Sequence, residues 1–190
     1  PYMLHASAKV NAGAGAVKLL FSNTGGQAGV FHVYDQLDLG AVPRRYMVQA
    51  GKQLEDDWAL KNGQYDLWVL GPNGFHRAFK GDVTEKAQLD ALPEIRVCME
   101  ECAPRIFLKI RHDGQQGADL TVKANAYLDG KTWQVKSAAS ETDVVLDMQS
   151  VHGWYDFSVT LNSSGSFERR FAGRIETGKD GYSDPFMGAE

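Results

Sequence analysis

Side chains that could act as nucleophiles, general bases or metal ligands are scattered through this chain of 190 residues. A nucleophilic serine, threonine or cysteine needs a base beside it in a defined turn, such as a Gly-x-Ser-x-Gly elbow. The nearest string, Ser163-Ser164-Gly165-Ser166, is typical of a hairpin loop. The histidines are His5, His32, His76, His112 and His152. They lack the close spacing of a metal-binding helix or loop, so we interpret them as structural or surface residues.

Acidic side chains occur close together at residues 55–57, at residues 100–101, and at Asp180 with Asp184. General acid–base chemistry needs two carboxylates on opposite sides of a bond, inside a pocket. Adjacent acids in a turn are more often solvated, although loop oxygens can also bind calcium. We expect solvated carboxylates, and a loop calcium site is the less favoured alternative.

The two cysteines, Cys98 and Cys102, are separated by three residues. A disulfide between them would close a loop of about five residues and contribute at most roughly 2 kcal/mol in the chain-entropy model. Reduced thiols fit the sequence equally well. Without a second cysteine pair or a nearby histidine motif, the two do not predict a zinc site. We therefore predict no metal and no cofactor.

Tryptophans offer aromatic surfaces that could bind a ligand. They are Trp58, Trp68, Trp133 and Trp154. An exposed tryptophan can insert among lipid headgroups or hold a choline ammonium by a cation–π contact, whereas a buried one contributes roughly 2 to 3 kcal/mol to a small core. Trp68 is out of phase with its apolar neighbours and Trp154 precedes Tyr155, so these two are the better candidates for an outer face. Burial in a core or between domains remains the favoured interpretation.

Arginines form the second group of candidate ligand contacts. They are Arg44, Arg45, Arg77, Arg169 and Arg170. They could bind phosphate headgroups, or they could pair with the acids of a chain whose net charge is −4, and we favour pairing. The speculative lipid- or ligand-binding set is therefore Trp68, Trp154, Arg44, Arg45, Arg169 and Arg170.

Four of these six candidates, Trp68, Trp154, Arg169 and Arg170, lie in a stretch that occurs twice. Residues 63–83 read GQYDLWVLGPNGFHRAFKGDV, and residues 153–175 read GWYDFSVTLNSSGSFERRFAGRI. When they are aligned, Tyr65-Asp66 falls on Tyr155-Asp156. The further matches are Val69 with Val159, Phe75 with Phe167, Phe79 with Phe171 and Gly81 with Gly173. We predict that the chain consists of two copies of one fold.

Each copy predicts a strand, a turn and a return strand. Alternating apolar residues such as Tyr65, Leu67 and Val69 show the period of a strand with one buried face. The first turn, residues 71–74, contains Asn-Gly, which supplies the positive φ angles of a tight hairpin.

The return strands carry a charged residue on their apolar face. Phe75 and Phe79 lie four residues apart with Arg77 between them on the same face. The second copy repeats this arrangement with Phe167, Arg169 and Phe171.

The repeated Tyr-Asp pair has a functional and a structural interpretation. The aspartates could be ligand groups. We favour the structural interpretation, in which Tyr65 and Tyr155 lie in the core with their hydroxyls bonded to backbone, as in a tyrosine corner, while Asp66 and Asp156 face outward.

Turn signals roughly every 8 to 12 residues divide each half into seven short strands, the pattern of a small sandwich. The first half is expected to have strands near residues 4–10, 17–22, 30–34, 44–48 and 54–60, and the second near 95–99, 106–110, 120–126, 132–135 and 142–148, each followed by the two strands of the repeated stretch. The predicted fold is all-β, with two tandem Ig-like or jelly-roll-like sandwiches. The expected boundaries are 1–84 and 93–178 for the sandwiches, 85–92 for a polar linker and 179–190 for a C-terminal tail.

Composition and charge exclude some classes of protein. A net charge of −4 without a dense basic face argues against a nucleic-acid partner. No run approaches the ~20 apolar residues of a membrane-spanning helix. Residues 1–10 lack a charged region followed by an apolar core, so they do not predict a signal peptide. The chain opens as a strand, and we expect it to be part of a longer protein.

The strings YDLWVLGPNGFHRAF, GWYDFSVT, FERRFAGRIETG and DPFMG together resemble a known family region. It is the repeated C-terminal domain of bacterial phosphocholine-preferring phospholipases C, the hemolytic and non-hemolytic enzymes whose catalytic part is related to acid phosphatases. The resemblance covers nearly the whole chain as two tandem copies, and the order VFHVYD, PRRY, DDW, YDLWVLGPNGFHR is specific.

The resemblance implies an exported parent enzyme that cleaves phosphatidylcholine, and often sphingomyelin, to phosphocholine and diacylglycerol or ceramide. It implies a secreted or periplasmic location and an N-terminal phosphatase-like catalytic domain as the partner. The family's nucleophile and metal ligands lie in that domain, so no catalytic residue is carried over to any position here.

Three hypotheses about function follow. The leading hypothesis is a non-catalytic C-terminal module of a secreted phospholipase C that supports the catalytic domain and contacts a phosphatidylcholine membrane surface. The alternative is a carbohydrate- or cell-surface-binding sandwich, because exposed tryptophans also suit sugars. A free-standing hydrolase is the least favoured, since no nucleophile or metal set is visible.

Overall fold

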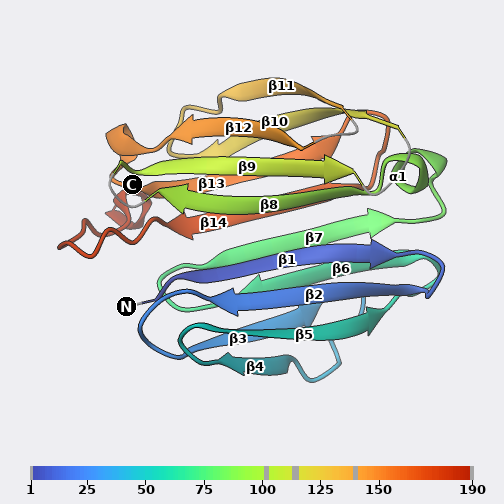
Figure 1. The fold of residues 1–190 in the computed structure, drawn as a ribbon, viewed down its shortest axis with the longest axis horizontal. Coiled ribbons are helices and arrows are strands. Elements are labelled where there is room, and N and C mark those ends of the chain that lie inside the picture. Colours follow the sequence, from blue (N-terminus) through green and yellow to red (C-terminus); the bar gives the residue numbers. More distant parts are fainter. Residues whose placement is uncertain (1, 101–102, 113–115, 139–140, 189–190) are drawn as a thin grey trace.

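The protein is described here from a computed structural model that covers residues 2–100, 103–112, 116–138 and 141–188. The described residues form fourteen strands in three antiparallel sheets, with one short α-helix and two short 3₁₀ helices, Gln149–Val151 and Pro185–Gly188 (Figure 1). None of the helices in this part of the chain is long and apolar enough to cross a membrane.

The first seven strands form the first unit. A three-stranded sheet has the order β1-β2-β5, from β1 (Leu4–Asn11), β2 (Ala16–Asn23) and β5 (Lys52–Ala59). The opposite layer has the order β7-β6-β3-β4, from β3 (Gly29–Asp35), β4 (Arg44–Val48), β6 (Gln64–Leu70) and β7 (His76–Asp82). The two layers enclose one apolar core, so this unit is a small β-sandwich.

The second unit repeats this arrangement after α1 (Lys86–Ala91). A three-stranded sheet has the order β12-β9-β8, from β8 (Pro93–Glu100), β9 (Arg105–His112) and β12 (Thr142–Asp147). The opposite layer has the order β11-β10-β13-β14, from β10 (Ala118–Ala126), β11 (Thr132–Ser137), β13 (Trp154–Leu161) and β14 (Glu168–Arg174). The prediction of an all-β fold with two tandem sandwiches is confirmed.

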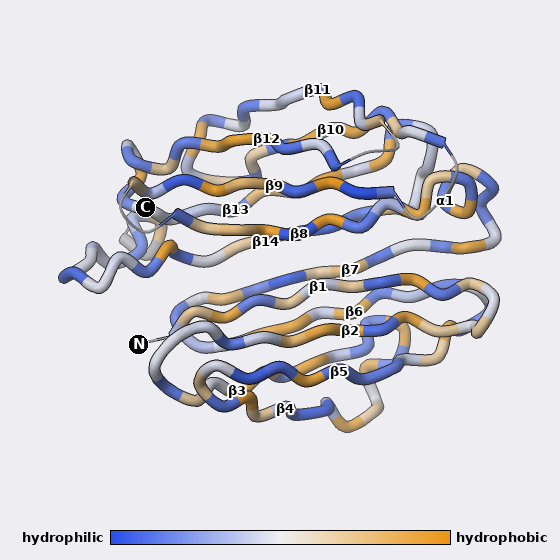
Figure 2. Tube along the Cα trace, viewed as in Figure 1, coloured by the Kyte–Doolittle hydropathy of each residue, from blue (hydrophilic) through white to orange (hydrophobic). Residues whose placement is uncertain are grey.

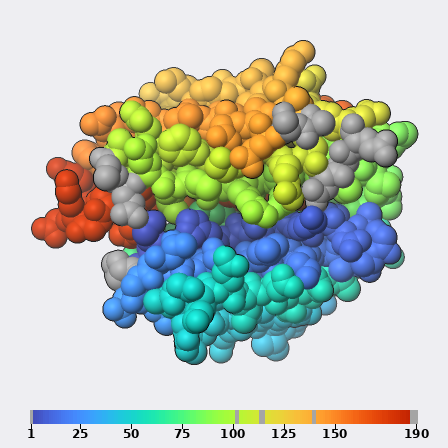
Figure 3. Space-filling view, in the orientation of Figure 1, coloured from blue at the N-terminus to red at the C-terminus, as the bar shows by residue number. Residues whose placement is uncertain are grey.

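The two sandwiches share a sheet, which the sequence did not predict. Strands β7 and β14 pair antiparallel, from Glu168 opposite Lys80 to Ala172 opposite His76. The four-stranded layers therefore join into one eight-stranded sheet that runs through both units. We call the β7–β14 junction the seam. The two halves of the chain also meet along their length in the space-filling view (Figure 3).

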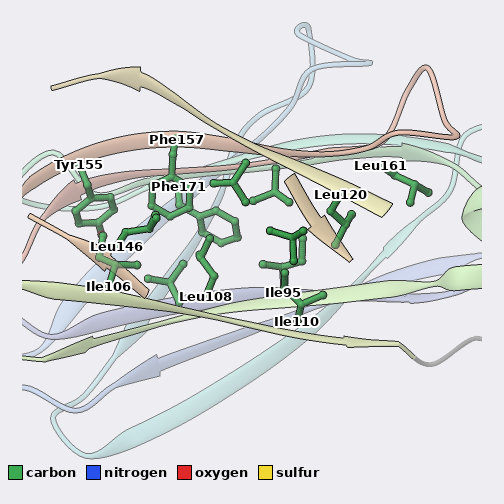
Figure 4. Packing of buried hydrophobic residues seen from close by; sticks show 14 of the residues in the cluster. Ile95, Ile106, Leu108, Ile110, Leu120, Leu146, Tyr155, Phe157, Leu161 and Phe171 are labelled. Carbon is green, nitrogen blue, oxygen red and sulfur yellow. The ribbon is translucent and has the colours of Figure 1, made fainter. Parts of the chain in front are cut away.

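The strands form where the sequence alternates, because every second side chain enters a core. Along β13, for example, Tyr155, Phe157, Val159 and Leu161 are buried while the residues between them are more exposed. The tube coloured by hydropathy shows the same alternation along many strands (Figure 2). In the second core, aromatic side chains of β13 and β14 pack against isoleucines and leucines of β8 and β9 (Figure 4).

Turn chemistry and the connection between the units also follow the sequence. Asn73 and Gly74 have φ angles of 56° and 71°, as the Asn-Gly hairpin requires. The segment expected to be a linker contains α1 and is tied to the second unit. Its Gln88 is 3% exposed and donates from Nε2 to the hydroxyls of Ser164 (2.9 Å) and Ser166 (2.7 Å).

Asn23 at the end of β2 provides a test of the first sandwich. Its side chain donates to the carbonyls of Gln27 (2.7 Å) and Val48 (3.1 Å) and accepts from the Gly25 N–H (3.0 Å). Because Asn23 is 1% exposed, Asn23→Ala leaves these groups unpaired, and we expect the free energy of unfolding in urea to fall by about 2 to 4 kcal/mol. The matched control is Asn125→Ala on the exposed side of β10, with a loss of about 0.5 kcal/mol or less. Equal losses would contradict this role for Asn23.

Candidate functional site

The seam is built from two arginines that the units exchange. Arg77 of β7 donates from Nη2 to the hydroxyl of Tyr155 (2.9 Å) and from Nη1 to a carbonyl of β14 (2.8 Å). Arg169 of β14 donates from Nη2 to the hydroxyl of Tyr65 (2.6 Å) and from Nη1 to a carbonyl of β7 (2.7 Å). Each unit therefore supplies one arginine to the other unit and one tyrosine that receives the other's arginine.

Both guanidinium groups are enclosed, and each residue is 1% exposed. Arg77 lies 4.1 Å from the ring centroid of Phe75, and Arg169 lies 4.2 Å from that of Phe167. Within the described part of the chain, neither arginine has an ion pair with a carboxylate. An arginine stays protonated in proteins, so its charge is accommodated here by carbonyl oxygens, a hydroxyl and aromatic faces.

This burial corrects two sequence-based interpretations of the arginines. Arg169 belongs to the predicted lipid- or ligand-binding set, but a guanidinium at 1% exposure does not reach a ligand in solvent. The favoured alternative, pairing with acids, does not occur for Arg77 or Arg169 among the described residues. The signal in the sequence was the arginine at an inward-facing position between two phenylalanines in each copy.

The tyrosines that receive these arginines also differ from expectation. Tyr65 and Tyr155 are buried, as expected, but their hydroxyls bind an arginine of the other unit and not backbone of their own corner. Each tyrosine lies opposite a glycine, Gly81 or Gly173. A methyl group added at Gly81 would collide with the Tyr65 hydroxyl. In each unit the glycine leaves space for the tyrosine opposite it, whose hydroxyl binds the buried arginine of the other unit.

The aspartates of the repeated pair face the opposite, outer side of the shared sheet. Asp156 forms an ion pair with Arg170 (2.6 Å), and Asp66 lies 3.6 Å from Nζ of Lys80. Burial raises the pKa of Asp66, and the charge of Lys80 opposes that shift. The hydrogen bonds that Arg170 donates to the Asp156 carboxylate raise the pKa of Arg170. These contacts are the acid–base pairing that we favoured for the basic residues.

Other acidic residues singled out from the sequence also hold local structure. Asp56 accepts from Arg44 (2.9 Å) and from the hydroxyl of Tyr46 (2.5 Å). Burial, then the bond to Asp56, raises the pKa of Tyr46 to about 12. Glu55 pairs with Lys18 (2.7 Å). Among the residues that the structure describes, no group of three or more His, Cys, Asp or Glu side chains is arranged to hold a metal ion.

The remaining members of the candidate set lie on separate elements. Arg44 and Arg45 are exposed on β4, and Arg44 also covers the ring of the buried Trp58 at 4.0 Å. Trp68 on β6 is 39% exposed on the outer face, so the favoured burial does not hold for it. Trp154 on β13 is half-buried, and its indole N–H donates to the carbonyl of Tyr182 in the C-terminal tail (3.1 Å).

The tail lies against the second unit rather than extending freely. The hydroxyl of Tyr127 donates to Asp184 (2.9 Å), and Phe186 meets the Tyr127 ring edge-on at 4.9 Å. The acidic pair Asp180 and Asp184 is therefore divided, because Asp184 is engaged by Tyr127 whereas Asp180 is exposed. Cys98 is half-buried on β8, and Cys102 and Glu101 lie outside the described residues, so the disulfide stays a prediction.

A known family model matches the chain twice, once for each unit. The family model described as "Bacterial phospholipase C, C-terminal domain" matches residues 1–82 and again residues 93–174. The first match covers β1 to β7, and the second covers β8 to β14. The chain belongs to this family. The phospholipase C C-terminal domain thus occurs here twice, joined through the α1 segment.

Three phospholipases C are similar in sequence to nearly the whole of this chain. A non-hemolytic phospholipase C of Pseudomonas aeruginosa is 40% identical over 99% of the chain, and that of Burkholderia pseudomallei is 36% identical over 98%. A hemolytic phospholipase C of Pseudomonas aeruginosa is 34% identical over 98%. The chain spans only 27–29% of the length of these curated relatives.

Substitution of an arginine that binds the opposite unit should greatly reduce the stability of the protein. Arg169→Met leaves the Tyr65 hydroxyl and carbonyls at the seam without a donor, so we expect the free energy of unfolding to fall by about 3 to 5 kcal/mol. The adjacent Arg170→Met is the matched control, because its ion pair lies on the outer face and should be worth about 1 kcal/mol. Chemical denaturation measures both. A loss at Arg169 no greater than that at Arg170 would show that the seam does not depend on the exchange.

His76 at the seam predicts a dependence of stability on pH. Burial first, and then the charge of Arg170, lower the pKa of His76. The unfolded chain therefore binds a proton near pH 6.5 that the folded chain resists, so stability is retained above about pH 7 and lost as the pH falls through about 6.5. His76→Gln removes this proton uptake, and its free energy of unfolding should fall less between about pH 7.5 and 5.5 than that of the unchanged protein. Identical pH profiles would exclude His76 as a contributor.

Proposed function

We propose that this chain is the non-catalytic C-terminal module of a secreted phospholipase C that hydrolyses phosphatidylcholine. The observation that carries this proposal is the double match to the C-terminal domain family, together with the 27–29% of each relative's length that the chain covers. The remaining length of such a parent would carry the phosphatase-like catalytic domain. The module supports that domain and contacts the membrane lipid that the enzyme attacks.

The seam supports a structural role in the parent. Two sandwiches joined only by a linker would move relative to each other, as domains with small polar interfaces do. Here a shared sheet and two buried arginines fix the units as one platform. We propose unit boundaries of 1–84 and 93–178, a connector of 85–92 and a tail of 179–190, which is consistent with the two family matches.

The test compares three proteins: the 190-residue chain, a longer parent protein that contains it, and the parent without it. A soluble chromogenic ester of phosphocholine and phosphatidylcholine vesicles serve as the two substrates. We expect turnover only by proteins that contain the preceding region. Removal of the module should lower the temperature at which activity is lost and reduce vesicle hydrolysis more than hydrolysis of the soluble ester.

Four outcomes would count against the proposal. Turnover of the ester by the 190-residue chain alone would make the module catalytic. A parent that hydrolyses neither substrate would remove the assigned reaction. Unchanged heat stability and vesicle hydrolysis after removal of the module would remove the supporting role, and binding of the chain to glycans without lipid would favour the carbohydrate-binding alternative.

A further inference from the structure

The outer face of the shared sheet differs between the two units. The first-unit outer face is defined by the outward-facing residues Val30, His32, Tyr34, Met47, Trp68 and Leu70, with the exposed Arg45 beside them opposite His32. Equivalent positions in the second unit follow from the pairing of strands, because Val33 pairs with Val69 as Val122 pairs with Val159. These equivalents are Asp119, Thr121, Lys123, Lys136, Ser158 and Thr160.

Cross-strand pairs on this face change character from one unit to the other. Val30 opposite Met47 in the first unit becomes Asp119 opposite Lys136 in the second. Tyr34 opposite Trp68 becomes Lys123 opposite Ser158. His32 opposite Leu70 becomes Thr121 opposite Thr160. Three pairs that each contain an apolar or aromatic side chain are thus replaced by three polar ones, whereas His32 opposite Arg45 is polar in both units, its equivalent being Thr121 opposite Gln134.

The second unit serves as an internal control for what the fold requires. It forms the same layer with polar pairs, so the sandwich does not need apolar residues on this side of the sheet. The first unit nevertheless exposes Met47 at 66%, Trp68 at 39% and Val30 at 38%. Large apolar side chains exposed together on one face are typical of a surface that another protein surface covers.

A hollow beside this face leads to the start of the described chain. It encloses about 550 Å³ and is lined by residues that include Tyr2, Val30, Tyr34 and Leu70. Since Tyr2 forms part of its wall, any polypeptide that precedes residue 1 joins the module next to the first-unit outer face. This face lies behind the three-stranded sheets in the view of Figure 1.

We propose that the first-unit outer face is the docking surface for the catalytic region that precedes this chain in the parent phospholipase C. The proposal rests on the proposed function, and it adds the surface and the residues. About seven tenths of each relative's length lies outside the match, and the family model names the matched part the C-terminal domain. A domain tethered beside Tyr2 meets this face at a high effective concentration, so a modest apolar patch is enough to hold it.

Met47 provides a direct probe of docking. Peroxide oxidises an exposed methionine thioether to the sulfoxide, which mass spectrometry quantifies at single residues. We expect Met47 to oxidise in the parent protein at least about threefold more slowly than in the 190-residue chain, because the catalytic region covers it. Equal rates in the two proteins would overturn the proposal. This readout does not depend on activity, so it separates a failure of docking from a failure of the assigned reaction.

The docking role of the first-unit outer face can be tested in the parent by giving it the residues that occupy the equivalent positions of the second unit. Met47→Lys and Trp68→Ser introduce residues that the equivalent positions already carry, so the sandwich should keep its own stability. In the parent they should make the junction before residue 1 at least about threefold more sensitive to limited proteolysis. The matched controls are Val145→Lys and Leu54→Ser on the three-stranded sheets, with exposures of 53% and 39%, and these should leave the junction unchanged.

Two further results would overturn the docking proposal. If the face variants and the controls cleave at the same rate, the catalytic region docks elsewhere or not at all, and the proposal fails. If Met47 is exposed in the parent and becomes protected only when phosphatidylcholine vesicles are added, the face binds membrane and the proposal also fails.

Discussion

The two-unit architecture depends on burying positive charge without a carboxylate beside it. Arg77 and Arg169 each donate to a tyrosine hydroxyl and a backbone carbonyl of the opposite unit, and these acceptors are within reach only when β7 and β14 lie side by side. Leaving a guanidinium in a dry site without these acceptors would cost far more than the pairing of two strand edges contributes. The arginines therefore set which edges meet and in which register.

Joining these edges also solves a problem of the separate sandwiches. Each four-stranded layer on its own would present β7 or β14 as an open edge with unpaired N–H and C=O groups, which invites association with other chains. Pairing the two edges leaves β4 and β11 as the ends of the shared sheet. The seam holds the two units together, while their outer faces differ, and the first-unit outer face exposes apolar residues that the second lacks at the equivalent positions.

Much of the fold could be predicted from the sequence, because local signals determine it. Alternation predicted the first strand of each repeated stretch, and Asn73-Gly74 predicted the first turn. The return strands were predicted from the turns before them and from their short length, because a spacing of four between phenylalanines also fits a helix. The pairing of β7 with β14 could not be predicted from a sequence pattern, because strand edges pair through backbone N–H and C=O groups that nearly every residue has. The inward-facing positions of Arg77 and Arg169 were the sequence feature that hinted at this pairing.

The candidate site was predicted less well for a related reason. Residue type alone does not show whether an arginine points to solvent or to a partner unit, so adjacent Arg169 and Arg170 received one interpretation and occupy opposite faces. The phase of Trp68 marked it as the better outer-face candidate, although burial was the favoured interpretation. The cover that the tail provides for Trp154 depends on a contact with Tyr182, some 28 residues later. The contrast between the two outer faces needed the strand register, which only the structure supplies.

The exchange of arginines also restricts how such a chain can evolve. Once each copy keeps its tyrosine pocket for the other copy's arginine, neither half can be lost, shuffled into another protein or replaced by a distant relative without leaving an empty pocket and a stranded charge. Selection then acts on the pair as one heritable unit. Arg77 should covary with Tyr155, and Arg169 with Tyr65, across the long distance in the chain that separates the partners.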